Sequence, residues 1–87
     1  MEYTKDELNL IKQFAEMLAE QIFASKNRGA EGFVFRMTNP ETDEEVIKIK
    51  VWGQAFKDIQ TEEGFSAFIY TIAPHFVSGF KKAYKID

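Results

Sequence analysis

Two short alternating runs in the middle of the chain constrain its fold more than any other feature. Residues 32–38 and 46–52 carry a strongly apolar side chain at every second position. A period of two is the pattern of a β-strand with one buried and one exposed face. The predicted buried face carries Phe33, Phe35, Met37, Ile47, Ile49 and Val51. The opposite face would carry Val34, Arg36, Thr38, Val46, Lys48, Lys50 and Trp52, and its mixture of cations with an indole makes it a candidate contact surface.

The segment between the two runs, residues 39–45, predicts a turn and therefore an antiparallel hairpin. Asn39 followed by Pro40 favours turn initiation, and Pro40 cannot donate to a strand ladder. Three registers keep the apolar faces together, and the alternation does not choose among them. The middle register places Arg36 opposite Lys48, a like-charge pair that is unfavourable unless an anion neutralises it.

Signals at both ends predict a long first helix over residues 5–27. Thr4 and Glu7 have the spacing of a capping box, and Gly29 is placed to end the helix. The apolar residues of this helix cover more than half of its circumference, which is wider than one face of a two-stranded sheet requires. We therefore expect it to contact both the hairpin and either the C-terminal helix or a second chain.

The C-terminal third predicts one short and one long helix. Gly53 ends the second run, and residues 54–60 have the spacing of a short helix or turn. Thr61 is placed to cap a last helix, whose apolar stripe runs from Phe65 to Ala83. Pro74 lies inside that stripe and predicts a kink or a close restart. A third strand over residues 65–72 is the alternative, because that segment is rich in strand-forming residues.

These elements predict an α+β fold in the order αββαα, within one compact domain over residues 1–87. A two-stranded sheet is marginal alone, so helices must cover one face of the hairpin. The other face then meets water, a ligand or another protein, and a homodimer is one such arrangement. The chain has no cysteine, so disulfides and thiolate metal sites are excluded.

Composition and motifs exclude several classes of function. The net charge of −3 is too mild to imply a general polyanion ligand. No segment is apolar for long enough to span a membrane, and no secretory signal is evident at the N-terminus, so we expect a cytoplasmic protein. The glycines form no phosphate-binding series, so we expect no nucleotide cofactor, and indeed no cofactor of any kind.

Three groups of side chains resemble catalytic or metal-binding residues, and each has a simpler interpretation. His75 has no partner set for nucleophilic catalysis or metal binding and is interpreted as a partly buried helix histidine. Glu16 and Glu20 are one helical turn apart, but no second pair on another helix matches them. The acidic residues of the predicted turn lack the glycine of a calcium loop. We therefore expect no enzyme activity and no metal site.

The remaining candidate is a binding surface. It comprises the outward-facing residues of the runs and a basic group at the end of the last helix: Arg36, Lys48, Lys50, Trp52, Lys81, Lys82 and Lys85. The leading hypothesis is a small non-catalytic cytoplasmic protein-interaction module, such as an adaptor, inhibitor or assembly factor, whose partner is another protein or a second copy of itself. Short acidic chains without cysteine are also typical of phage and mobile-element accessory proteins. The alternative is a nucleic-acid-binding protein that uses the same residues, since exposed aromatics beside cations can stack bases. Trp52 could instead fold beneath the following helix.

Overall fold

The computed structural model describes residues 3–84, and its first element is the long helix α1, Lys5–Asn27. The Thr4 hydroxyl accepts from the Glu7 amide at 3.1 Å, and the Glu7 carboxylate accepts from the Thr4 amide at 2.8 Å. The predicted capping box is therefore confirmed. At the other end Gly29 has φ 74°, and its amide donates to the carbonyl of Lys26. This left-handed glycine ends the helix where the sequence predicts.

The two alternating runs form an antiparallel hairpin of β1, Gly32–Thr38, and β2, Glu45–Trp52. Phe35 lies opposite Ile49 and Arg36 lies opposite Lys48, so the register is the middle one of the three. The structure thus contains the like-charge pair that the alternation alone left undecided.

One residue of β2 departs from the expected alternation. Met37 pairs with Ile47 and Thr38 with Glu45, which leaves Val46 as an extra residue in a β-bulge. The bulge turns Val46 inward, where it is buried against the backbone beside Gly79. The prediction that Val46 lies on the outer face is therefore wrong, because strict alternation does not hold across a bulge.

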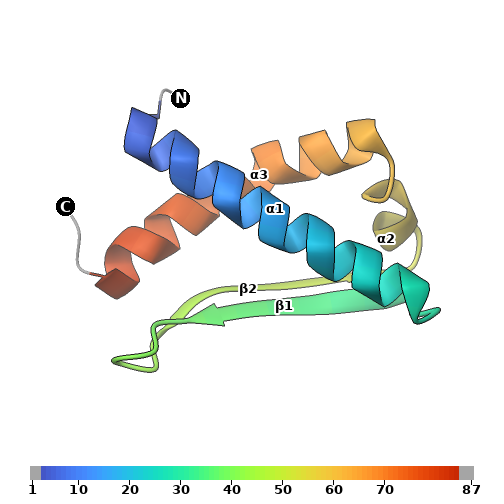
Figure 1. Ribbon diagram of the computed structural model, residues 1–87, viewed down its shortest axis with the longest axis horizontal. Coiled ribbons are helices and arrows are strands. Elements are labelled where there is room, and N and C mark those ends of the chain that lie inside the picture. The colour runs from blue at the N-terminus through green and yellow to red at the C-terminus, as the bar shows by residue number, and fades with distance from the viewer. Residues whose placement is uncertain (1–2, 85–87) are drawn as a thin grey trace.

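The rest of the chain is helical. The short helix α2, Gln54–Asp58, is followed by α3, Glu62–Tyr84. The Thr61 hydroxyl caps the first turn of α3, because it accepts from the Gly64 amide at 3.0 Å. Residues 65–72 belong to this helix, so the alternative of a third strand is wrong. The helix continues through Pro74, and its axis changes direction where it passes behind α1 (Figure 1).

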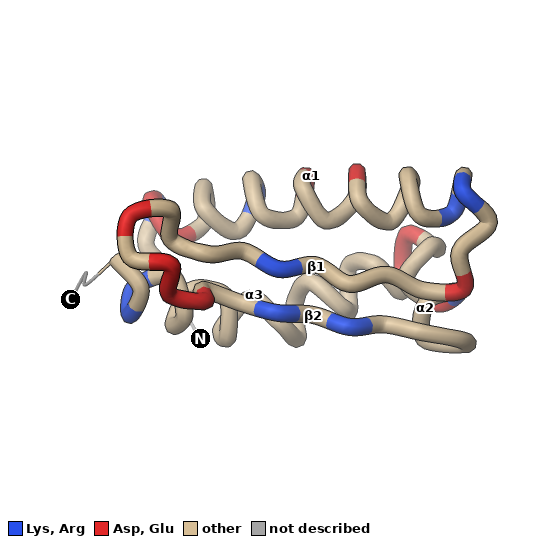
Figure 2. The backbone as a smooth tube through the Cα atoms, turned by 90° about the horizontal axis from the view of Figure 1, so that it is seen from below, with Lys and Arg blue, Asp and Glu red and all other residues tan. Residues whose placement is uncertain are grey.

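The helices and the hairpin form two layers. α1 packs on β1 and α3 packs on β2, so both long helices cover the same face of the hairpin (Figures 1 and 2). Phe14 of α1 and Phe76 of α3 stack at 3.9 Å between ring centroids in the middle of the core, and both are fully buried. Within residues 3–84, no element covers the opposite face of the hairpin.

Candidate functional site

The uncovered face of the hairpin is the surface that the alternation predicted. We call it the outer face, and it consists of Val34, Arg36, Lys48, Lys50 and Trp52, all of which are exposed. Figure 2 looks onto this face, with the basic positions in the middle of both strands, α3 behind β2 and α1 beyond β1. The structure therefore brings together four of the seven predicted binding residues.

Trp52 stays on the outer face and does not fold beneath the following helix. It lies directly opposite Gly32, and 57% of its surface is exposed. A Cβ built at residue 32 would collide with the indole ring, so the absence of a side chain lets the indole cover that end of β1. Gly32 is correspondingly buried. The result is a flat aromatic surface at one end of the outer face.

The cations of the outer face are only partly neutralised. Arg36 and Lys48 lie opposite each other, and the Arg36 Nε is 3.2 Å from Glu45 Oε1 in an exposed ion pair. Within residues 3–84, no carboxylate forms an ion pair with Lys48 or Lys50. Glu45 thus offsets the like-charge pair, and the two lysines are free to meet an acidic partner.

The predicted C-terminal lysines do not join the outer face. Lys81 Nζ reaches Glu7 Oε2 at 2.6 Å at the start of α1, on the covered side of the hairpin. The hydrogen bond from Lys81, followed by that from the Thr4 amide, holds the pKa of Glu7 below its usual value. Lys82 lines a groove with Glu44 and Glu45 beside the start of β2. Lys85 lies outside the described residues.

Carboxylates stand at both ends of the outer face. The hairpin turn carries Glu41, Asp43 and Glu44, all exposed, and Glu31 is exposed just before β1. Figure 2 shows these acidic positions on either side of the basic ones. The positive region is therefore short and limited to the middle of the hairpin.

The candidate catalytic and metal-binding residues are dispersed. His75 is exposed rather than partly buried, since it lies on the flank of α3 that borders the groove with Glu44 and Lys82. Glu16 and Glu20 are exposed on α1, as expected of its polar strip. In the described part of the chain, no three His, Asp or Glu residues are grouped closely enough to hold a metal ion.

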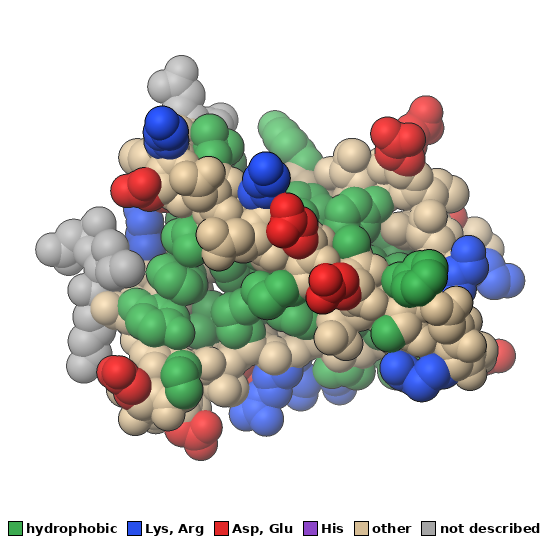
Figure 3. All heavy atoms as spheres, in the orientation of Figure 1, with side chains coloured by type: hydrophobic (Ala, Val, Ile, Leu, Met, Phe, Trp, Pro, Cys, Tyr) green, Lys and Arg blue, Asp and Glu red, His purple; other side chains and the backbone are tan. Residues whose placement is uncertain are grey.

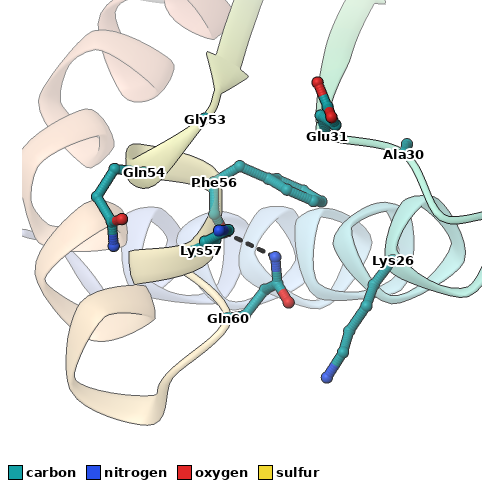
Figure 4. Close-up of a pocket in the computed structure, with 8 residues that line it drawn as sticks. All are labelled: Lys26, Ala30, Glu31, Gly53, Gln54, Phe56, Lys57 and Gln60. Carbon is teal, nitrogen blue, oxygen red and sulfur yellow. Dashed lines mark hydrogen bonds between the residues drawn. The ribbon is translucent and has the colours of Figure 1, made fainter.

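A mixed pocket of about 440 Å³ lies where α1 ends and the hairpin meets α2. Phe56 reaches across it toward the start of β1, and the side-chain Nε2 of Gln60 donates to the Phe56 carbonyl at 3.0 Å (Figure 4). Lys26 extends outward from α1 at its mouth. Throughout residues 3–84, every buried side-chain nitrogen or oxygen has a hydrogen-bond partner, so no buried side-chain polar atom in this pocket is left without one.

A second hollow, of about 400 Å³, separates α1 from the first half of α3. Its walls are almost wholly apolar and include Leu8, Ile11, Phe65, Ile69 and Tyr70, and the Tyr70 side chain is 83% exposed. The wide apolar arc of α1 predicted two contacts for that helix, and α3 is the second one. The groove itself was not predicted, because the exposure of Leu8 and Tyr70 becomes visible only in the tertiary structure.

The comparisons with known proteins identify no relative. No family model, no curated protein and no solved structure matches this chain. Among the described residues, none of the helices has both the length and the apolar character needed to cross a bilayer.

Proposed function

We propose that this chain is a non-catalytic protein-interaction module and that its partner presents an acidic surface to the outer face of the hairpin. The observation that carries the proposal is the exposed indole of Trp52 beside Lys48 and Lys50, which form no ion pair within the described residues. Exposed tryptophan in a small well-packed domain is the residue type that most often supplies an interface anchor. Cations around such an anchor select partners of opposite charge.

The shape of the outer face supports a protein partner. Val34 lies directly opposite Lys50 and is 48% exposed, so apolar and basic groups lie side by side on the hairpin. Protein interfaces also combine apolar contact area with charged groups, although here the apolar groups lie toward one end of the face and the cations in its middle. Two helices pack on the other face of the hairpin, and this support reduces the conformational entropy that the hairpin loses on binding.

The charge distribution disfavours nucleic acid as the partner. A polyanion that extends along the hairpin beyond its three cations would meet Glu31 at one end and the acidic turn at the other. Trp52 is also the only aromatic side chain on the outer face, whereas single-strand binders use several stacking positions. Nucleic acid is therefore an outcome that the test must separate from a protein.

Photo-cross-linking tests the proposal. A photoreactive amino acid is placed at Lys50, and a control variant carries it at the exposed Lys12 of α1. We expect a discrete adduct in extracts of the source cell from position 50 only, sensitive to protease and resistant to nuclease. A nuclease-sensitive adduct would favour the nucleic-acid alternative, and equal labelling from both positions would overturn the proposal.

The single tryptophan offers an independent readout. Because Trp52 is the only indole in the chain, its emission reports on the outer face without interference. We expect poly-L-glutamate to change this emission at low salt more strongly than a single-stranded oligonucleotide of equal charge. Lys48→Glu should abolish the change, whereas Lys12→Glu, which alters the net charge equally, should not. A stronger response to the oligonucleotide would contradict the proposal.

A further inference from the structure

The hydrogen-bonding pattern of the hairpin shows which backbone N–H and C=O groups point to its free edges. The Gly53 amide donates to the Glu31 carbonyl at 3.0 Å, so these two residues form a hydrogen-bonded pair. Pairs of this kind alternate along an antiparallel ladder, and the register therefore places Val34 and Arg36 in the pairs that exchange no hydrogen bonds. Their N–H and C=O groups point away from β2. Among the described residues, no other strand or backbone group pairs with them.

The free edge of β1 is accompanied by an apolar strip. α1 lies on the side of β1 away from β2 (Figure 2). Leu10 and Met17 occupy the flank of α1 turned away from the groove with α3; Leu10 is half-buried and Met17 is 38% exposed. Phe35 and Met37 of β1 are also only partly buried. Figure 3 views the molecule from this side and shows hydrophobic side chains gathered between α1 and the hairpin.

The free edge of β2 offers no comparable surface. The backbone N–H and C=O groups of Lys48 and Lys50 point out from this edge. Lysines on an edge strand discourage the addition of another strand. The flank of α3 beside this edge carries His75, Ser78 and Lys82, which are polar and exposed. A strand added beside the start of β2 would therefore meet these polar side chains of α3. The two edges of the hairpin are therefore not equivalent.

We propose that the partner adds an extended strand to the free edge of β1, and that this strand alternates apolar with acidic residues. The inference rests on the proposed function and specifies its geometry. Backbone hydrogen bonds to Val34 and Arg36 supply affinity in this mode, and alternate side chains supply specificity. The apolar side chains of the added strand cover Leu10, Met17, Phe35 and Met37, and its carboxylates lie beside Arg36 on the outer face.

Charge selects a different protein over a second copy of this chain. β1 contains no acidic residue, and antiparallel pairing with its own copy would place two Arg36 side chains on the same face of one sheet. Like charges at neighbouring positions on one sheet face are destabilising. An acidic strand instead places carboxylates directly beside Arg36, on the same sheet face as Lys48 and Lys50, which lie one strand further away.

A synthetic peptide of alternating Glu and Val tests the geometry, and a peptide with the same composition in two blocks is the control. We expect the alternating peptide to slow hydrogen exchange at the Val34 and Arg36 amides, but not at Lys48 and Lys50. The block peptide should bind at least about tenfold more weakly. Absence of protection at millimolar peptide would overturn the proposal.

Two pairs of variants locate the edge. Val34 and Lys50 are direct partners whose amides face opposite edges, so Val34→Pro removes a donor from the β1 edge and Lys50→Pro removes one from the β2 edge. We expect only Val34→Pro to abolish peptide binding. If Val34→Pro fails to fold, Met17→Ser decides: it should weaken binding, whereas Leu8→Ser, on the other flank of α1, should not. Equal effects within either folded pair would overturn the proposal.

The outcomes separate this inference from the proposed function. Peptide binding that depends on Trp52 without protecting Val34 and Arg36 would overturn strand addition and leave the proposed function intact. Binding that depends on neither Trp52 nor the β1 edge would overturn both. Protection of Val34 and Arg36 in the chain alone, with twice its 10.1 kDa mass in solution, would show that a second copy occupies the edge and would overturn the acidic partner.

Discussion

Trp52 and Gly32 lie directly opposite each other at one end of the hairpin, and the indole occupies the space where residue 32 would have a side chain. The pair explains why a glycine begins β1 although glycine weakens strands. An aromatic residue across from a strand glycine covers the backbone that the glycine exposes. The candidate binding surface therefore depends on a missing side chain as much as on the residues present.

Gly32→Ala tests this relationship. The added Cβ would collide with the indole and with the Val51 carbonyl, so we expect the indole to be displaced and the chain to lose about 1–3 kcal/mol of stability. Urea unfolding measures the loss, and a red shift of Trp52 emission reports the displacement. Val34→Ala, at the next outer-face position, should cost less than about 1 kcal/mol. An unchanged emission maximum in Gly32→Ala would contradict the assignment.

The ion pair and capping bond of Glu7 should make the stability of the fold depend on pH in the acidic range. Its pKa is lowered by Lys81 and by the Thr4 amide, so in the unfolded chain Glu7 binds protons more readily. Its contribution is therefore complete above the ordinary value of 4.5 and is lost as the pH falls through the lower folded value. Glu7→Gln should lower the melting temperature at pH 7 and flatten the acid dependence. Asp6→Asn, one residue away, should leave most of that dependence in place, and an unaltered pH profile in Glu7→Gln would refute the coupling.

The Asn39 side chain joins the hairpin turn to the end of α3. It is buried, its Nδ2 donates to the Ala83 carbonyl at 3.1 Å, and its Oδ1 accepts from the Glu41 amide at 2.9 Å. Asn39→Ala removes both bonds and should cost about 1–3 kcal/mol. Asn39→Asp keeps the acceptor for Glu41 but loses the donor, so it should still accelerate hydrogen exchange in the last turn of α3. Exchange at wild-type rates in Asn39→Asp would show that the bond to Ala83 contributes nothing.

The absence of a side chain at Gly79 allows α3 to approach the bulge in β2 closely. A Cβ at residue 79 would collide with the Val46 carbonyl, so Gly79→Ala must push the helix away from the strand. Helix propensity favours alanine by about 1 kcal/mol, and we expect overpacking of about 1–3 kcal/mol to exceed it. Thermal unfolding should show Gly79→Ala less stable than Ser78→Ala, at the exposed adjacent position. Gly79→Ala more stable than the wild type would show that the helix can move without cost.

The helix ends are the part of the fold that the sequence predicted best. The bounds of α1 follow from Thr4, Glu7 and Gly29, whose capping bonds join residues a few positions apart. Thr61 likewise marks the start of α3. Such signals are local, so they can be recognised before the tertiary structure is known.

The candidate site was predicted in part for a related reason. Alternation placed Arg36, Lys48, Lys50 and Trp52 on one face, and the structure keeps them there. Alternation did not predict the inward position of Val46, because strict alternation does not hold across a bulge; the bulge lies where Gly79 of α3 approaches β2. The separation of Lys81 from the outer face also depends on where α3 runs after Pro74.

The sequence by itself determined the limits of α1 and β1, the start of α3 and the shared face of the four outer-face binding residues, because these follow from periodicity and from capping residues close in the chain. Only the tertiary structure decided the register, the exposure of Trp52 and the difference between the two edges of the hairpin. These depend on contacts between residues distant in the chain, such as Gly32 with Trp52. Packing of both helices on one face of a two-stranded sheet is what leaves the other face and the β1 edge available to a partner.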